Sequence, residues 1–224
     1  MQSLTLLQSR ETKERFDSAS YESQLLTTLG EASHLTEKHN RILVPYFFSL
    51  VKIDPSTSTT ASRPALPKQK LVLWLTLFSK LSNPKALHAT SALRNLYLHL
   101  LAHPLRPLQR AALDCLFTYK SPALTSRQDQ LRTLFDDTRW RDELTNLDIS
   151  AIDGNDADEV VAVILRMLFG LMLEKKGRGR GADRRAAVLG ALGSCTEEQL
   201  GLLVDLMLLP LGVDRSAHAG EAEQ

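Results

Sequence analysis

Apolar residues recur at helical spacing along most of the chain. Between residues 21 and 40, one stripe of a helix holds Leu25, Leu26, Leu29, Ala32 and Leu35, with charged residues opposite. The apolar run that follows predicts a buried helix that begins near Leu43 or Val44 and therefore tolerates Pro45. The alternation of apolar and polar residues that is typical of a strand persists nowhere. The sequence therefore predicts an all-α protein.

The same spacing continues towards the C-terminus and predicts a series of further helices. Several carry terminal signals: Pro107, for example, suits the first position of a helix, and Thr196, followed by Glu198 and Gln199, resembles a capping box. Residues 121–126 are expected to connect two of them. The predicted helical segments are 69–81, 91–102, 107–120, 127–135, 136–147, 160–176, 182–194 and 196–210.

The predicted helices come in pairs, and each pair with its turn occupies roughly forty residues. This period favours a HEAT/armadillo-like α-solenoid of paired antiparallel helices, and a compact helical bundle is the competing architecture. The predicted organisation is a partly helical lead-in over residues 1–20, a helical-repeat domain over 21–210 and a disordered tail over 211–224. Three prolines and a Ser/Thr cluster predict a flexible loop at 54–68 inside the domain.

Composition and charge fit this picture and narrow the function classes. Of the 224 residues, 43% are hydrophobic and only 6% are aromatic, which favours helices over a β-sandwich. The net charge is +1, so affinity for nucleic acid would need a local patch. Two cysteines, Cys115 and Cys195, exclude a disulfide framework. No signal-peptide pattern opens the chain and no apolar run reaches the roughly twenty residues of a membrane span. We therefore expect a soluble intracellular protein that contacts no membrane.

One stretch, "LEKKGRGRGADRRAAVLGAL" from Leu173 to Leu192, concentrates positive charge between two predicted helices. A nucleotide-binding P-loop is not supported, because the glycine-lysine-hydroxyl sequence is missing and a helix precedes the stretch. Arginine presents a fork of donors that matches phosphate oxygens, and glycine lets the backbone adapt. A solvated flexible connection is the alternative interpretation. The candidate contacts with RNA or phosphate are Lys175, Lys176, Arg178, Arg180, Arg184 and Arg185.

The remaining polar side chains predict no catalytic, cofactor-binding or metal-binding residue and no small-molecule substrate. His99 and His103 lie four positions apart on one predicted helix, but no third ligand accompanies them. We expect His103, which precedes Pro104, at the end of that helix. A short acidic segment is interleaved with Arg139 and Arg141, which predicts an ion-paired surface helix rather than an acid–base pair. Its carboxylates belong to Asp136, Asp137, Asp142 and Glu143.

Several phrases of the sequence go beyond a generic helical pattern. In order, they are "FSKLSNPKALHATSALRNLYLHLLAHP", "LQRAALDCLFTYKSPAL", "LFDDTRWRDELTNL", "VILRMLFGLMLEKKGRG" and "RRAAVLGALGSCTEEQLGLLVDLMLLP". Together they resemble the HEAT-repeat family known as down-regulated in metastasis, also called U-three small nucleolar RNA-associated protein twenty. The likeness is strongest from Phe78 to Pro210, and "LTEKHNRILVPYFFSLV" is a looser match upstream.

The resemblance implies a non-catalytic helical-repeat scaffold of the small-subunit processome, which acts in ribosomal RNA processing and ribosome biogenesis in the nucleolus of the nucleus. The implied partners are processome proteins and pre-ribosomal RNA. Family members are many times longer, so we expect a fragment, a split gene product or a truncated version, with apolar end faces that favour self-association. A free-standing armadillo-like adaptor that binds a peptide is the alternative, and a nucleotide-dependent enzyme would rest on the glycine stretch alone.

Overall fold

The computed structural model describes residues 18–53, 65–147, 149, 152, 157–174, 180–193 and 195–208. All regular secondary structure in these ranges is helical, and no strand occurs in them. In chain order the helices are α2 (Ser18–Glu31), α3 (Ser33–Lys38), α4 (Asn40–Val51), α5 (Lys68–Phe78), the 3-10 helix η1 (Pro84–Ala86), α6 (Thr90–Leu101), α7 (Arg106–Phe117), α8 (Pro122–Ser126), α9 (Gln128–Thr133), α10 (Trp140–Asn146), α11 (Ala157–Leu173), α12 (Arg180–Leu192) and α13 (Glu197–Leu208). The predicted all-α class is confirmed.

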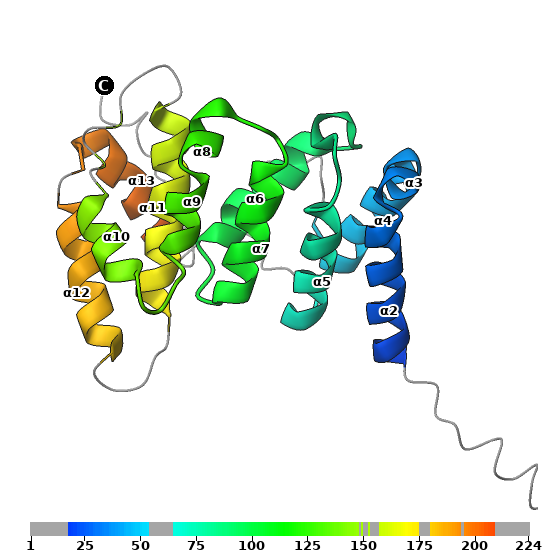
Figure 1. Ribbon diagram of the computed structural model, residues 1–224, viewed down its shortest axis with the longest axis horizontal. Helices are drawn as coiled ribbons and strands as arrows, with labels where there is room; N and C mark the ends of the chain where they lie inside the picture. The colour runs from blue at the N-terminus through cyan, green and yellow to red at the C-terminus, as the bar shows by residue number, and fades with distance from the viewer. Residues whose placement is uncertain are drawn as a thin grey trace, which may run out of the picture.

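The helices stand side by side in a row, with α2, α3 and α4 at one end and α12 and α13 at the other (Figure 1). Contacts run from neighbour to neighbour: α2 packs on α5, α5 on α7, α7 on α6, α6 on α11, and α11 on both α12 and α13. A short turn joins α6 to α7, so these two helices form an antiparallel hairpin. Each pair thus buries its apolar side against the next, as in a HEAT-like helical-repeat fold.

Helix α11 lies at the centre of the core. Its apolar residues surround the helix instead of forming one stripe, and α6, α7, α8, α12 and α13 all contact it. The buried residues are Val160, Val161, Val163, Ile164, Leu165, Met167, Leu168, Phe169, Gly170 and Leu171. Neither α11 nor any other helix among the described residues has both the length and the apolarity that a membrane span requires.

A buried glutamine joins α6, α7 and α11. The Gln109 Nε2 group donates hydrogen bonds to the carbonyl oxygen of Leu101 at 2.6 Å and to that of Met167 at 3.2 Å. Gly170 makes this approach possible, because a Cβ atom at that position would lie 2.7 Å from the Leu101 oxygen and 2.9 Å from the His103 oxygen. The missing side chain therefore lets α11 pack directly against the turn between α6 and α7.

Aromatic side chains join α4 to α5 at the N-terminal end of the row. The ring centroid of Phe47 lies 5.0 Å from that of Phe78 and 5.4 Å from that of Trp74. Trp74 is buried, so it is a packing residue and offers no exposed ring to a peptide. These contacts fix α4 on the side of α5.

The first helices differ from the predicted single stripe. The chain turns at Ala32, so residues 21–40 form α2, α3 and the start of α4 instead of one helix. The Thr36 hydroxyl donates to the Leu29 carbonyl oxygen at 2.7 Å, and this bond holds α3 against the end of α2. The change of direction turns part of the predicted stripe outward. Its exposed members are Leu25 and Leu35.

Helix α4 begins earlier than predicted and is less buried. It starts at Asn40, so Pro45 lies inside the helix and not in its first turn. One side packs on α5, but Ile42 is 74% exposed and Tyr46 is also exposed. The prediction of a buried helix is therefore wrong for this side of α4.

Other boundaries were predicted with mixed success. Residues 121–126, expected to be a connection, contain α8. The capping box is confirmed, because the Thr196 amide donates to Gln199 Oε1 at 3.0 Å and the Gln199 amide donates to Thr196 Oγ1 at 3.4 Å. Of the predicted loop, residues 54–64 lie outside the described residues, and α5 already begins at Lys68. Residues 1–17 and the tail 211–224 also lie outside them.

Replacing Gly170 by alanine should lower the free energy of unfolding by about 3 kcal/mol, because the new methyl group would collide with two backbone carbonyl oxygens. Gly190, on the exposed side of α12, is the matched control, since no atom lies within 4 Å of an added Cβ there. Gly190→Ala should raise the free energy of unfolding by roughly 0.5–1 kcal/mol through helix propensity. Urea unfolding followed by circular dichroism measures both variants. Equal stabilities would contradict the close approach of α11.

Candidate functional site

Two arginines and two carboxylates meet where α7, α11 and α12 come together. Arg184 of α12 is only 4% exposed, and its Nη1 donates to Glu174 Oε2 at 2.9 Å while its Nη2 lies 3.4 Å from Asp137 Oδ1. Arg106, at the start of α7, donates from Nε to the same Glu174 oxygen at 2.9 Å and also pairs with Asp137. We refer to Arg106, Asp137, Glu174 and Arg184 as the clamp. It joins three helices through charge-assisted hydrogen bonds.

Trp140, the first residue of α10, covers the clamp. The guanidinium carbon of Arg184 lies 4.3 Å from the centroid of the Trp140 ring, which adds a cation–π contact to the two ion pairs. The clamp contains two positive and two negative groups, so their formal charges cancel. Its chemistry therefore holds helices together and contributes no net charge to the surface.

The structure separates the predicted RNA-contact residues. Arg184 faces inward, and intramolecular partners occupy its guanidinium group. Arg185 is exposed, and Arg180 is the first residue of α12. The other three lie outside the described residues: Lys175, Lys176 and Arg178.

The helical phase of α12 distinguishes the two neighbouring arginines. Arg184 is in phase with Val188 and Leu192, which are both buried, whereas Arg185 is in phase with Leu189, which is 55% exposed. This spacing is visible in the sequence and would have identified Arg184 as an inward-facing residue. Its partner Asp137 could not be found in this way, because Asp137 and Arg184 are 47 positions apart.

Of the acidic segment before and within α10, Asp137 is ion-paired, but its partners lie on other helices. Asp137 pairs with Arg106 of α7 and with Arg184 of α12, whereas Asp136 accepts hydrogen bonds from the amide and the hydroxyl of Thr138. Arg141 pairs with Asp183 of α12. The ion pairs of Asp137 and Arg141 connect α10 and the turn before it to the rest of the row.

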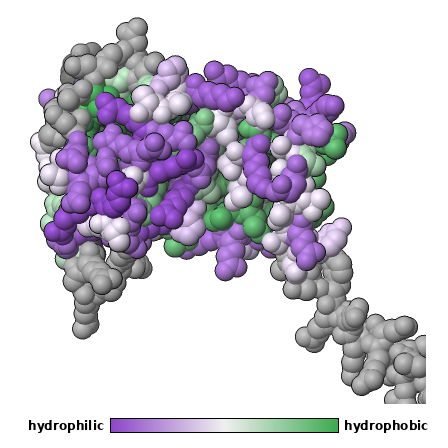
Figure 2. Space-filling model, viewed as in Figure 1, coloured by the Kyte–Doolittle hydropathy of each residue, from purple (hydrophilic) through white to green (hydrophobic). Residues whose placement is uncertain are grey.

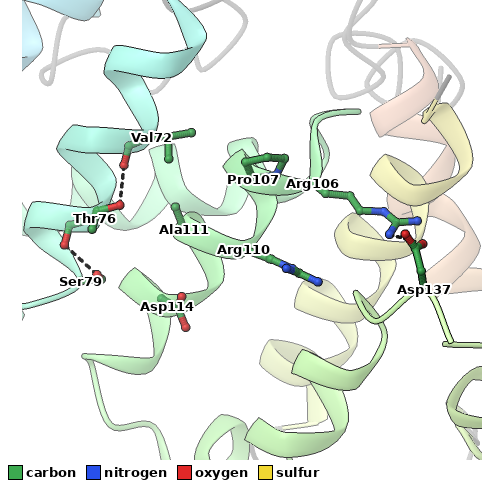
Figure 3. A pocket seen from close by; sticks show the side chains of 9 residues that line it. All are labelled: Val72, Thr76, Ser79, Arg106, Pro107, Arg110, Ala111, Asp114 and Asp137. Atoms are coloured by element: carbon green, nitrogen blue, oxygen red, sulfur yellow. Dashed lines mark hydrogen bonds and ion pairs between the residues drawn. The ribbon is translucent and has the colours of Figure 1, made fainter. Parts of the chain in front are cut away.

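A shallow groove crosses the face formed by α5 and α7 (Figure 3). It encloses about 420 Å³ and contains both arginines and aspartates, including Arg110 and Asp114. Asp137 links it to a second hollow over α10 and α12. Figure 2 shows that hydrophilic side chains cover most of the surface over α9, α10 and α12. With both charge signs along its length, the groove offers no continuous track for phosphates.

His99 and His103 do not share a helix. Because α6 ends at Leu101, His103 lies beyond it, and its Nδ1 accepts a hydrogen bond from the Leu105 amide at 3.0 Å. Burial, and then the positive charge of Arg166, lower the pKa of His99. The prediction that His99 and His103 share one helix is therefore wrong, although His103 does lie just beyond the end of α6. No group of three or more His, Cys, Asp or Glu side chains that could hold a metal ion is found in the part of the chain that the structure describes.

Cys115 is a packing residue. It is buried in α7, and its thiol donates to the Leu75 carbonyl oxygen at 3.1 Å. Burial raises the pKa of this thiol well above its usual range, which keeps it protonated and unreactive.

Comparison with known proteins identifies the relatives of the chain. A family model described as "U3 small nucleolar RNA-associated protein 20, N-terminal" matches residues 65–224, well over half of the chain. The chain is 32% identical over 197 residues to U3 small nucleolar RNA-associated protein 20 of Schizosaccharomyces pombe, a match that covers 85% of this chain and 8% of that protein. The chain belongs to this family.

The family assignment confirms the resemblance inferred from the sequence. U3 small nucleolar RNA-associated protein 20 of Saccharomyces cerevisiae is 31% identical over 124 residues, or 54% of this chain and 5% of that protein. The chain therefore spans less than a tenth of the length of these two relatives. Helices α5 to α13, which carry the clamp and the groove, lie within the region that the U3 small nucleolar RNA-associated protein 20 family model matches.

Replacing Arg184 by alanine should lower the free energy of unfolding by about 3 kcal/mol, because Glu174 and Asp137 would lose the buried one of their two cationic partners. Arg185→Ala is the matched control, since the neighbouring arginine is exposed and its loss should change stability by less than about 0.5 kcal/mol. Thermal and urea unfolding of both variants provide the measurement. If the two variants were equally stable, Arg184 would not be held in the clamp.

Proposed function

We propose that this segment is a non-catalytic helical-repeat scaffold of the small-subunit processome, and that it acts in small-subunit ribosomal RNA processing in the nucleolus. The main support for this proposal is the sequence similarity to U3 small nucleolar RNA-associated protein 20, which extends over 85% of the chain. The row of paired helices supports this function because it offers long flanks for docking proteins. The clamp also supports it, since charged groups that join helices serve architecture and not a reaction.

We also propose that the basic stretch contacts pre-ribosomal RNA. The contacts would come from Arg185, which is exposed on α12, and from the preceding cations of the stretch. Arg184 is omitted because the clamp occupies its guanidinium group. The proposed RNA contacts are Lys175, Lys176, Arg178, Arg180 and Arg185.

A tagged form of the chain, expressed in the organism that encodes it, should concentrate in the nucleolus and co-purify with U3 small nucleolar RNA and pre-ribosomal RNA. Fluorescence microscopy and quantification of the bound RNAs measure this association. The Gly170→Ala variant, whose packing is expected to be disturbed, should show a reduced association. Purification of the intact chain without either RNA would contradict a role in the processome.

Substitution of the five proposed RNA contacts by alanine should weaken binding to ribosomal RNA and flatten its salt dependence. Each lost phosphate contact should reduce the slope of log K against log salt by about one unit. A charge-matched control removes five exposed cations elsewhere: Lys68, Lys80, Lys85, Lys120 and Arg139. Affinities are measured at several salt concentrations with Arg184 retained, so that the clamp is intact. Equal slopes for the two variants would show that only net charge matters and would exclude a local RNA site.

A further inference from the structure

One arginine on the partly exposed side of α11 has no carboxylate partner among the described residues. Arg166 is partly buried and in phase with Glu159 and Ala162, two other residues of α11 that are not fully covered. Its Nη1 group donates to the Ala162 carbonyl oxygen of the same helix at 3.1 Å. The ion pairs of the described ranges do not involve Arg166. Its guanidinium group thus differs from those of the clamp, which join helices to one another.

Two further basic side chains lie near Arg166. Both belong to α6, which packs on α11 in the middle of the row (Figure 1). Burial, and then the positive charge of Arg94, lower the pKa of the Arg166 guanidinium group. The charge of Arg166 in turn reaches His99, whose pKa is lowered by burial and then by this charge. We refer to Arg94, His99 and Arg166 as the α6–α11 cluster.

The two carboxylates at the start of α11 do not compensate Arg166. Glu159 Oε1 accepts from Arg94 Nη2 at 2.6 Å, and its Oε2 accepts from Ser121 Oγ at 2.7 Å, so the charges of Arg94 and Glu159 cancel. Asp158 is exposed in the first turn of α11, where water screens its charge. The positive charge of Arg166 is therefore left over, and His99, which its lowered pKa keeps neutral, adds an N–H donor.

An uncompensated charge in a partly buried position destabilises the fold. A buried cation is stabilising only where a counter-charge and hydrogen bonds offset the loss of its hydration. The clamp meets this condition, because both of its arginines contact carboxylates. Arg166 does not meet it, although α11 is strongly apolar and a neutral side chain would suit this position. Charged groups that are retained at a cost to stability are concentrated at binding and catalytic sites.

We propose that the α6–α11 cluster binds a phosphate group of an RNA backbone. This proposal deepens the proposed contact with pre-ribosomal RNA and rests on it. A phosphodiester carries a single negative charge, which matches the uncompensated charge of Arg166. Its free oxygens accept hydrogen bonds from a guanidinium fork and from an imidazole N–H. Arg166 lies about two turns before the end of α11, after which the basic stretch begins, so one RNA strand can contact both places.

Three variants of the full chain test the α6–α11 cluster. Arg166→Gln removes the charge but keeps an amide that can donate to the Ala162 carbonyl oxygen, and Arg166→Lys keeps the charge. Arg139→Gln, at an exposed arginine directly before α10, is the charge-matched control. Binding of each protein to a short single-stranded RNA is measured at several salt concentrations, and circular dichroism gives the melting temperatures.

Arg166→Gln should bind the RNA about tenfold more weakly and reduce the slope of log K against log salt by about one unit. Arg166→Lys and Arg139→Gln should retain the slope. The melting temperature of Arg166→Gln should not fall below that of the unchanged chain, because the variant removes an unpaired charge. A loss of binding without a loss of stability separates a ligand contact from a packing role. In NMR spectra, the His99 imidazole resonances should shift when RNA is added to the unchanged chain and stay in place in Arg166→Gln.

An unchanged salt slope or a marked loss of stability in Arg166→Gln would overturn the proposal, and so would His99 resonances that RNA does not move. Inorganic phosphate and a glutamate-rich peptide are the comparison probes. A response to either of them but not to RNA would assign the α6–α11 cluster to a free anion or to a protein carboxylate instead. If RNA binding depends on the basic stretch but not on Arg166, only this proposal fails. If the unchanged chain binds no RNA, the proposed RNA contact of the basic stretch fails with it.

Discussion

The need to cover α11 on most of its sides is the constraint on which the rest of the structure depends. Ten of its seventeen residues are buried, and a helix with so broad an apolar surface is stable in water only when neighbours pack around it. Five helices contact α11, and they come from both sides of it in the chain, so its burial joins the α6–α7 hairpin to the α12–α13 pair. The row of helices is thus held together at its centre by apolar packing, with the free energy of burial as its main source.

Polar groups determine how the neighbours are placed on that apolar helix. At one point of α11, Gly170 leaves room for Gln109 to reach two backbone carbonyl oxygens. At its C-terminal end, Glu174 accepts from both Arg106 and Arg184, so α7 and α12 are positioned relative to the same carboxylate. Apolar packing alone would tolerate sliding between helices, whereas these directional contacts select one arrangement.

The periodicity of apolar residues predicted the fold well where a helix packs according to its own sequence pattern. It predicted the fold less well where contacts between helices decide the structure. The apolar patterns of α5, α6, α7 and α11 each predicted a helix at the right place. The break at Ala32 was missed because it depends on the docking of α3 against α2, and Pro45 was expected near a helix start although the helix begins five residues earlier. The clamp could be predicted only in part. The phase of α12 identifies Arg184 as buried, but its pairing with Asp137 and its stacking on Trp140 depend on how segments far apart in the chain meet.

The clamp also bears on how the basic stretch can act. Glu174 and Arg184 stand at the two ends of residues 175–183, and the ion pair between them holds these ends together. Folding therefore already brings the two ends of this segment together. An RNA that binds the segment does not have to offset the conformational entropy that is lost when the ends are fixed. Because the clamp's own charges cancel, attraction for phosphate must come from the cations between its two ends and from Arg185. Helical phase therefore separates the roles of two neighbouring arginines. Arg184 faces the core and stabilises the repeat, whereas Arg185 faces solvent, where a phosphate can reach it.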